Sequence, residues 1–124
     1  MKKVIATPDA PKAVGPYSQA IEANGTLYIS GQIPVDPADG RIAEDITAAA
    51  HQSLKNIGAI LKEAGMTYDN VVKTTVLLAD IADFKAVNEV YAEYFTGDKP
   101  ARACYQAAAL PLGVKVEIEA IAVK

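Results

Sequence analysis

Arg102 is the side chain in this sequence that is best suited to binding a small ligand. The chain has only two arginines, and the other, Arg41, follows a predicted turn. Arg102 instead lies in a strand-like segment between Ala101 and Ala103, which leave space beside it. A guanidinium presents its donors in a planar fork that matches a carboxylate. Composition alone favours a salt bridge at the surface or at an interface for Arg102, whereas its small neighbours favour a clamp for a small carboxylate ligand.

Glu117 and Glu119 alternate within an apolar segment, so they share one side of a predicted strand. The simplest interpretation of such a pair is a solvated strand face. A glutamate beside an apolar cleft would instead have a raised pKa, because burial disfavours its charged form. Such a group can move protons near neutral pH. The sequence does not indicate which of the two glutamates is buried.

Cys104 and His51 are the only cysteine and histidine, and nothing in the sequence pairs them. Cys104 shares the Arg102 side of its strand, whereas His51 lies on a helical segment that we expect to pack against the opposite sheet face. We interpret Cys104 as a small buried thiol and His51 as a helix-surface residue. One cysteine and one histidine are too few for a structural zinc site, and no phosphate-binding loop or dinucleotide fingerprint is present.

The elements that must position these residues follow the order hairpin, helix, strand, helix, strand, strand. Asn24-Gly25 predicts a tight turn between strands at 18–22 and 26–30. Apolar residues at spacings of three and four predict helices over 46–64 and 84–95, the second capped by Asp83 and ended by Gly97. Strands are predicted near 71–78, 101–107 and 114–123. This order predicts an α+β fold with two helices on one face of a single sheet.

The last predicted strand has two unlike sides. One side is uniformly apolar, while the other carries the glutamates together with Ile121 and Val123. With helices on one sheet face only, the second face remains wet in a monomer, so we expect a homo-oligomer with a semi-polar interface and a cleft. The short connector Leu110–Gly113 by itself suggests a hairpin of the last two strands, with Cys104 opposite Glu117.

Composition limits the classes of function. A chain of 124 residues that is 51% hydrophobic and 22% charged is typical of one compact domain, here residues 1–124. The net charge of −3 disfavours sequence-independent binding of nucleic acid. The single cysteine fits a reducing compartment, and no signal peptide or membrane-spanning run is present, so we expect a cytoplasmic protein without membrane association.

Taken together, five motifs make the chain resemble the reactive-intermediate deaminase A family, also called RidA or YjgF. The similarity runs nearly from end to end, and the order and separation of the motifs make it specific. The motifs are Gly15-Pro16-Tyr17-Ser18-Gln19-Ala20, Ser30-Gly31-Gln32-Ile33-Pro34, Asp83-Phe84 with Asn88 and Tyr91, Pro100-Ala101-Arg102, and Val116-Glu117-Ile118-Glu119.

The resemblance implies a chorismate-mutase-like fold with a single mixed sheet, assembled as a homotrimer with three clefts between subunits. It places the last strand in the interior of the sheet, and this arrangement replaces the hairpin of the last two strands that the short connector suggests. It also implies hydrolytic deamination of enamines and imines such as 2-aminoacrylate to 2-oxo acids and ammonia, without cofactor or metal, which would protect pyridoxal-phosphate enzymes. Arg102 would bind the substrate carboxylate and Glu117 would activate water. The pocket would be lined, from two chains, by Tyr17, Ser30, Gly31, Asn88 and Cys104.

Two other functions are weighed against the deaminase. A metabolite sensor could use the same cleft to bind 2-oxo acids without turnover, although the presence of Arg102 favours the enzyme. Ribonuclease activity or translation inhibition is the weaker alternative, because the chain is acidic and has no pair of histidines.

Overall fold

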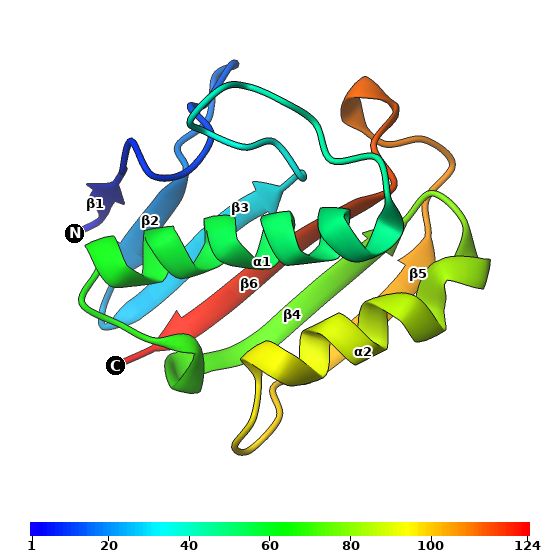
Figure 1. The fold of residues 1–124 in the computed structure, drawn as a ribbon. Helices are drawn as coiled ribbons and strands as arrows, with labels where there is room; N and C mark the ends of the chain where they lie inside the picture. The colour runs from blue at the N-terminus through cyan, green and yellow to red at the C-terminus, as the bar shows by residue number, and fades with distance from the viewer.

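Two helices cover one face of a six-stranded mixed sheet in the computed structural model, which describes residues 1–124 (Figure 1). This confirms the predicted α+β fold. The strands are β1 (Lys3–Ile5), β2 (Ala20–Ala23), β3 (Thr26–Gln32), β4 (Val71–Leu78), β5 (Ala101–Gln106) and β6 (Val116–Val123). The helices are α1 (Ile46–Glu63) and α2 (Phe84–Tyr94), with short 3₁₀ turns at Tyr68–Asn70, Ile81–Asp83 and Pro111–Gly113.

The strands lie in the order β1-β2-β3-β6-β4-β5. All neighbours are antiparallel except β4 and β5, which are parallel because α2 carries the chain back between them. The hairpin suggested by the Leu110–Gly113 connector is therefore wrong, and the deeper insertion implied by the family is confirmed. One whole side of β6 is apolar and buried, as suits a strand with a helix-covered core beneath it and a partner on each edge.

Local chemistry explains the first hairpin and α1. Asn24 and Gly25 have φ angles of 52° and 78°, the pair of positive values that a two-residue hairpin turn requires. Asp45 precedes α1, and its carboxylate accepts a hydrogen bond of 3.0 Å from the backbone N–H of Ala48. Gly65 follows the helix with φ 75°, a conformation in which glycine is unstrained. The predicted start and end of α1 are thus confirmed.

The predicted boundaries of α2 need correction. Asp83 stands at the N-cap position but makes no side-chain capping bond, because it already has helical dihedral angles at the end of a 3₁₀ turn. Asp80 instead caps the preceding 3₁₀ turn, Ile81–Asp83, where its carboxylate accepts a 2.9 Å hydrogen bond from the N–H of Ala82. The helix ends at Tyr94, three residues before the glycine that we expected to end it.

The hydrophobic core lies between the helices and one face of the sheet. Alternate residues of β6 are fully buried on this side: Val116, Ile118, Ala120 and Ala122. The other side of β6 carries the half-buried Glu117 and the exposed Glu119. No helix covers this second face, which we call the open face (Figure 1). Neither helix has the length and apolar character that crossing a bilayer requires.

Candidate functional site

The Arg102 side chain lies on the helix side of the sheet. The parallel register pairs Arg102 with Thr74 and Cys104 with Val76, and both β4 residues are buried under the helices. Arg102 and Cys104 therefore share the face that carries α1 and α2. Our expectation that α1 packs against the face opposite to Cys104 is wrong, because alternation along β5 does not reveal which side the helices cover.

Three side chains of α2 hold the Arg102 guanidinium. Its Nη1 donates a 2.7 Å hydrogen bond to Asn88 Oδ1. Its Cζ lies 4.9 Å from the centroid of the Tyr91 ring and 5.5 Å from that of Phe84. No carboxylate of the chain pairs with it, so a salt bridge within the chain is excluded. Apart from the bond to Asn88, the donors of Arg102 have no acceptor in the chain and are free for a ligand.

Glu117 and Gly31 meet on the open face. The pairing of β3 with β6 is irregular between Ile29 and Gln32, and this bulge brings the Gly31 backbone against the Glu117 side chain. A Cβ added at Gly31 would collide with the Glu117 carboxylate. Burial raises the pKa of the Glu117 carboxyl, and the charge of Glu119 raises it further. Glu117 is thus the partly buried glutamate that the sequence could not single out.

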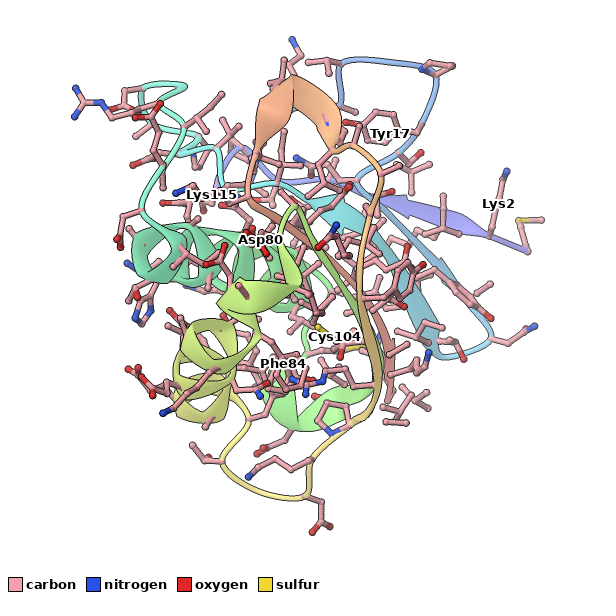
Figure 2. The ribbon with its side chains drawn as sticks, turned by 90° about the vertical axis from the view of Figure 1, so that its right-hand side faces the viewer. Lys2, Tyr17, Asp80, Phe84, Cys104 and Lys115 are labelled. Carbon is pink, nitrogen blue, oxygen red and sulfur yellow. The ribbon has the colours of Figure 1, made fainter.

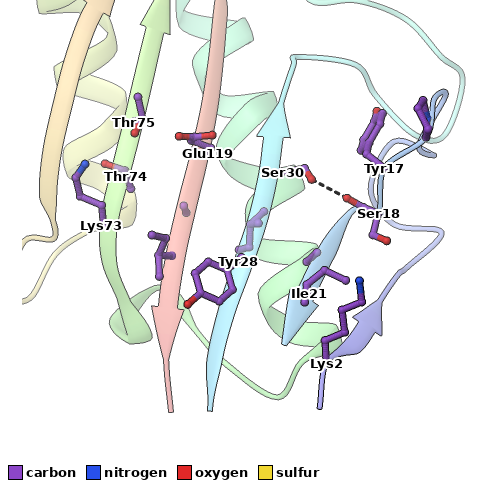
Figure 3. Close-up of a pocket in the computed structure, with 15 residues that line it drawn as sticks. Lys2, Tyr17, Ser18, Ile21, Tyr28, Ser30, Lys73, Thr74, Thr75 and Glu119 are labelled. Carbon is purple, nitrogen blue, oxygen red and sulfur yellow. Dashed lines mark hydrogen bonds between the residues drawn. The ribbon is translucent and has the colours of Figure 1, made fainter. Parts of the chain in front are cut away.

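Tyr17 and Ser30 lie on the same side of the sheet as Glu117. They line a cavity of about 600 Å³ on the open face, together with Ser18 and Glu119 (Figure 3). The Ser30 hydroxyl donates a 2.6 Å hydrogen bond to the carbonyl of Ser18, which ties the loop before β2 to β3. Glu117 is not among the residues that line this cavity. The cavity is therefore adjacent to the glutamate rather than centred on it.

The candidate site residues form two groups on opposite faces of the sheet. Figure 2 shows Phe84 beside α2 on one side of the molecule and Tyr17 on the other. The helix-side group consists of Asn88, Arg102 and Cys104; the open-face group consists of Tyr17, Ser30, Gly31 and Glu117. Because the sheet separates them, a single chain does not bring the carboxylate-binding arginine to the proton-accepting glutamate.

The helix-side thiol and the histidine do not form a catalytic pair. Burial raises the pKa of the Cys104 thiol, and the Arg102 charge offsets this only in part. Nδ1 of His51 lies 2.7 Å from the Tyr94 hydroxyl, in the contact between α1 and α2. His51 therefore has a partner on α2 and lies only partly at the surface. Cys104 is half-buried and unactivated, which agrees with its interpretation as a small structural thiol.

Sequence reasoning missed the two aromatic partners of Arg102. The apolar spacing that predicts the second helix includes Phe84 and Tyr91, but it gives neither of them a role beside Arg102. Tyr91 is buried, but 39% of Phe84 is exposed, and its ring faces the guanidinium rather than the core. The usable signal was the spacing of Phe84, Asn88 and Tyr91 at i, i+4 and i+7, which puts all three on one face of a helix.

Comparison with known proteins now identifies the family. The family model described as endoribonuclease L-PSP matches residues 7–124. A mouse protein named 2-iminobutanoate/2-iminopropanoate deaminase is 58% identical over 125 residues, which cover 100% of this chain and 93% of the mouse protein. The chain belongs to the L-PSP family. This confirms its resemblance to the reactive-intermediate deaminases.

Solved structures of L-PSP relatives have the same fold. YyfA from Yersinia pestis, a protein of the Rid family, superposes with a TM-score of 0.97 at 51% identity, with 100% of both chains covered. TdcF from E. coli, solved with bound serine, gives a TM-score of 0.96 at 44% identity over 98% of each chain. The single mixed sheet with two helices is thus the L-PSP fold.

Proposed function

We propose that this protein is an imine deaminase that hydrolyses 2-iminopropanoate, 2-iminobutanoate and the enamines that give rise to them, such as 2-aminoacrylate. The products are 2-oxo acids and ammonia, and the removal of these reactive species protects pyridoxal-phosphate enzymes. One observation carries the proposal: Arg102 is held by Asn88, has no carboxylate partner in the chain and keeps its other donors free. The name of the mouse relative supports the same chemistry.

We further propose that the active site forms between subunits of a chorismate-mutase-like homotrimer in the cytoplasm. Arg102 and Glu117 lie on opposite faces of one sheet, so a neighbouring copy must supply one of them. The open face has no helix to cover it and carries a cavity of about 600 Å³, as expected of a surface that a second copy covers. Each of three sites would then combine the helix-side group of one chain with the open-face group of the next.

The reaction follows from these groups. Enamines tautomerise to imines unaided, so the enzyme needs only to bind the imine and direct water to its carbon. A bidentate contact from Arg102 to the substrate carboxylate supplies orientation, which can be worth several kcal/mol of the barrier. Glu117 accepts a proton from the attacking water and returns one to the leaving nitrogen. Its raised pKa makes Glu117 a stronger base than an ordinary glutamate, and the hydrolysis requires neither cofactor nor metal.

The remaining site residues would have supporting roles. Tyr17, Ser30 and Gly31 line the water side of the proposed pocket, and Cys104 lines the side beside Arg102. The Asn88 amide oxygen is already occupied by the guanidinium, so this residue acts through Arg102. The proposed site thus has one group that binds the carboxylate, one that transfers protons, and a lining that orients both.

A turnover assay distinguishes the deaminase from a non-catalytic 2-oxo-acid sensor. A pyridoxal-phosphate dehydratase generates 2-aminoacrylate in situ, and the rate of pyruvate formation is followed with and without the protein. Faster pyruvate formation supports the deaminase. Binding of a 2-oxo acid without any acceleration would contradict it and would favour the sensor. An RNA-degradation assay with an Arg102→Ala control tests the weaker ribonuclease alternative.

Gly31→Ala should lower turnover by roughly 10- to 100-fold, because the new Cβ displaces the carboxylate that acts as general base. Steady-state kinetics at saturating imine measures the loss. Gly97→Ala is the matched control, because the nearest atom to a Cβ there is Asp69 Oδ1 at 3.7 Å, an ordinary contact. If the two variants were equally active, the contact between Gly31 and Glu117 would have no role in catalysis.

A further inference from the structure

We propose that Phe84 is a positioning residue for Arg102: its ring holds the guanidinium in the orientation that receives the substrate carboxylate. This inference deepens the deaminase proposal and rests on it for the identity of the substrate. Phe84, Asn88 and Tyr91 lie on one face of α2, and all three contact the guanidinium. Together they form what we call the arginine cradle.

The members of the arginine cradle are fixed to different degrees. Tyr91 is only 6% exposed, and its hydroxyl shares a 2.7 Å hydrogen bond with the buried Thr74, so packing and this bond fix the position of its ring. Asn88 sets the position of one guanidinium nitrogen. Phe84 is the exposed member and lies outside the hydrophobic core cluster. Core packing therefore does not account for this phenylalanine, whereas the 5.5 Å contact with Arg102 does.

The cradle reduces the cost of binding a carboxylate. A free arginine side chain has many rotamers, and holding it in one of them on binding costs conformational entropy. Ring contacts and one hydrogen bond settle the orientation of the guanidinium before the ligand arrives, so the remaining donors stay in a fixed plane. A positioning role of this kind strengthens binding of substrate and product carboxylates alike, and its loss should appear in KM more than in kcat.

Phe84→Leu tests the proposal, because it keeps an apolar side chain and removes the ring. We expect KM for 2-iminopropanoate and the dissociation constant for 2-oxobutanoate, measured by calorimetry, both to rise roughly 3- to 30-fold. The kcat value should change by less than about 3-fold. Phe84→Tyr retains the ring and should bind both ligands as the original protein does. Thermal melting of each variant verifies that the fold is intact.

Ile81→Ala is the matched control, because it removes another exposed apolar side chain, one that has no ring to place against the guanidinium. Four outcomes would each overturn the positioning role. Two concern Phe84 itself: unchanged ligand binding in Phe84→Leu, or a loss of binding in Phe84→Tyr as large as that in Phe84→Leu. The other two are an equally large loss of binding in Ile81→Ala, and a fall in the kcat of Phe84→Leu at constant KM. Because 2-oxobutanoate binding needs no turnover, these outcomes are distinct from failure of the deaminase proposal, which would appear as absent turnover in the unmodified protein.

Discussion

Arg102→Ala should lower kcat/KM for 2-iminopropanoate by roughly three orders of magnitude. The substitution removes the only group that we place against the substrate carboxylate, and losing a charge-assisted, bidentate contact in a desolvated site costs several kcal/mol. The fold should survive, because Arg102 lies on the edge strand β5 and forms no salt bridge within the chain. The coupled pyruvate assay measures the loss, with circular dichroism and gel filtration as controls of folding and assembly.

The second arginine of the chain provides the matched control. Arg41 is exposed, and the hydrogen bonds at this position involve its backbone only, so Arg41→Ala should retain full activity. Arg102→Lys should recover only part of the lost activity, because an ammonium cannot present the planar pair of donors. Near-normal turnover by Arg102→Ala would show that the carboxylate is bound elsewhere.

Glu117→Gln should lower kcat by about 10²- to 10⁴-fold, because an amide cannot accept the proton of the attacking water. The same residue predicts the pH dependence of the unmodified protein. Burial and the Glu119 charge raise the pKa of Glu117, and the reaction needs its carboxylate form. The rate should therefore rise with pH through this raised pKa and then level off, and Glu119→Gln should move the rise to lower pH.

The raised pKa of Glu117 also predicts how the stability of the fold depends on pH. Between the ordinary and the raised pKa of Glu117, the folded state binds more protons than the unfolded state, so stability falls as pH rises through that window. Above the raised pKa the Glu117 charge opposes folding, and in that pH range Glu117→Gln should raise the melting temperature while it lowers turnover. A variant that keeps its activity, or that melts at a lower temperature, would contradict the role of Glu117 as a partly buried base.

Elements determined by local chemistry were predictable from the sequence. Asn24-Gly25 encodes its turn through the conformational freedom of two residues, and α1 follows from one apolar stripe with a cap and a glycine stop. The position of β6 between β3 and β4 was not predictable from the residues, because no local pattern encodes which distant strands pair. Only the family resemblance implied it.

The candidate site was likewise predictable only in part. Arg102 and Glu117 stood out by residue type, and alternation correctly placed each relative to its own strand. Alternation shows which residues of one strand share a side, but it does not show which side of each strand faces the helices. The sequence therefore could not show that Arg102 and Glu117 lie on opposite faces of the sheet. It also could not show that Phe84 turns toward Arg102, because an aromatic residue in a helical stripe is equally suited to a core.

The central claim is that Arg102 and Glu117 act together only across a subunit boundary, and mixing two inactive variants tests it most directly. Arg102→Ala and Glu117→Gln proteins are unfolded together in equal amounts and refolded, and turnover is compared with each variant refolded alone. In randomly mixed trimers, about one quarter of the sites should combine an intact arginine with an intact glutamate and recover activity. No recovery, in mixtures shown to contain both chains, would mean that one chain supplies both residues and would contradict the account.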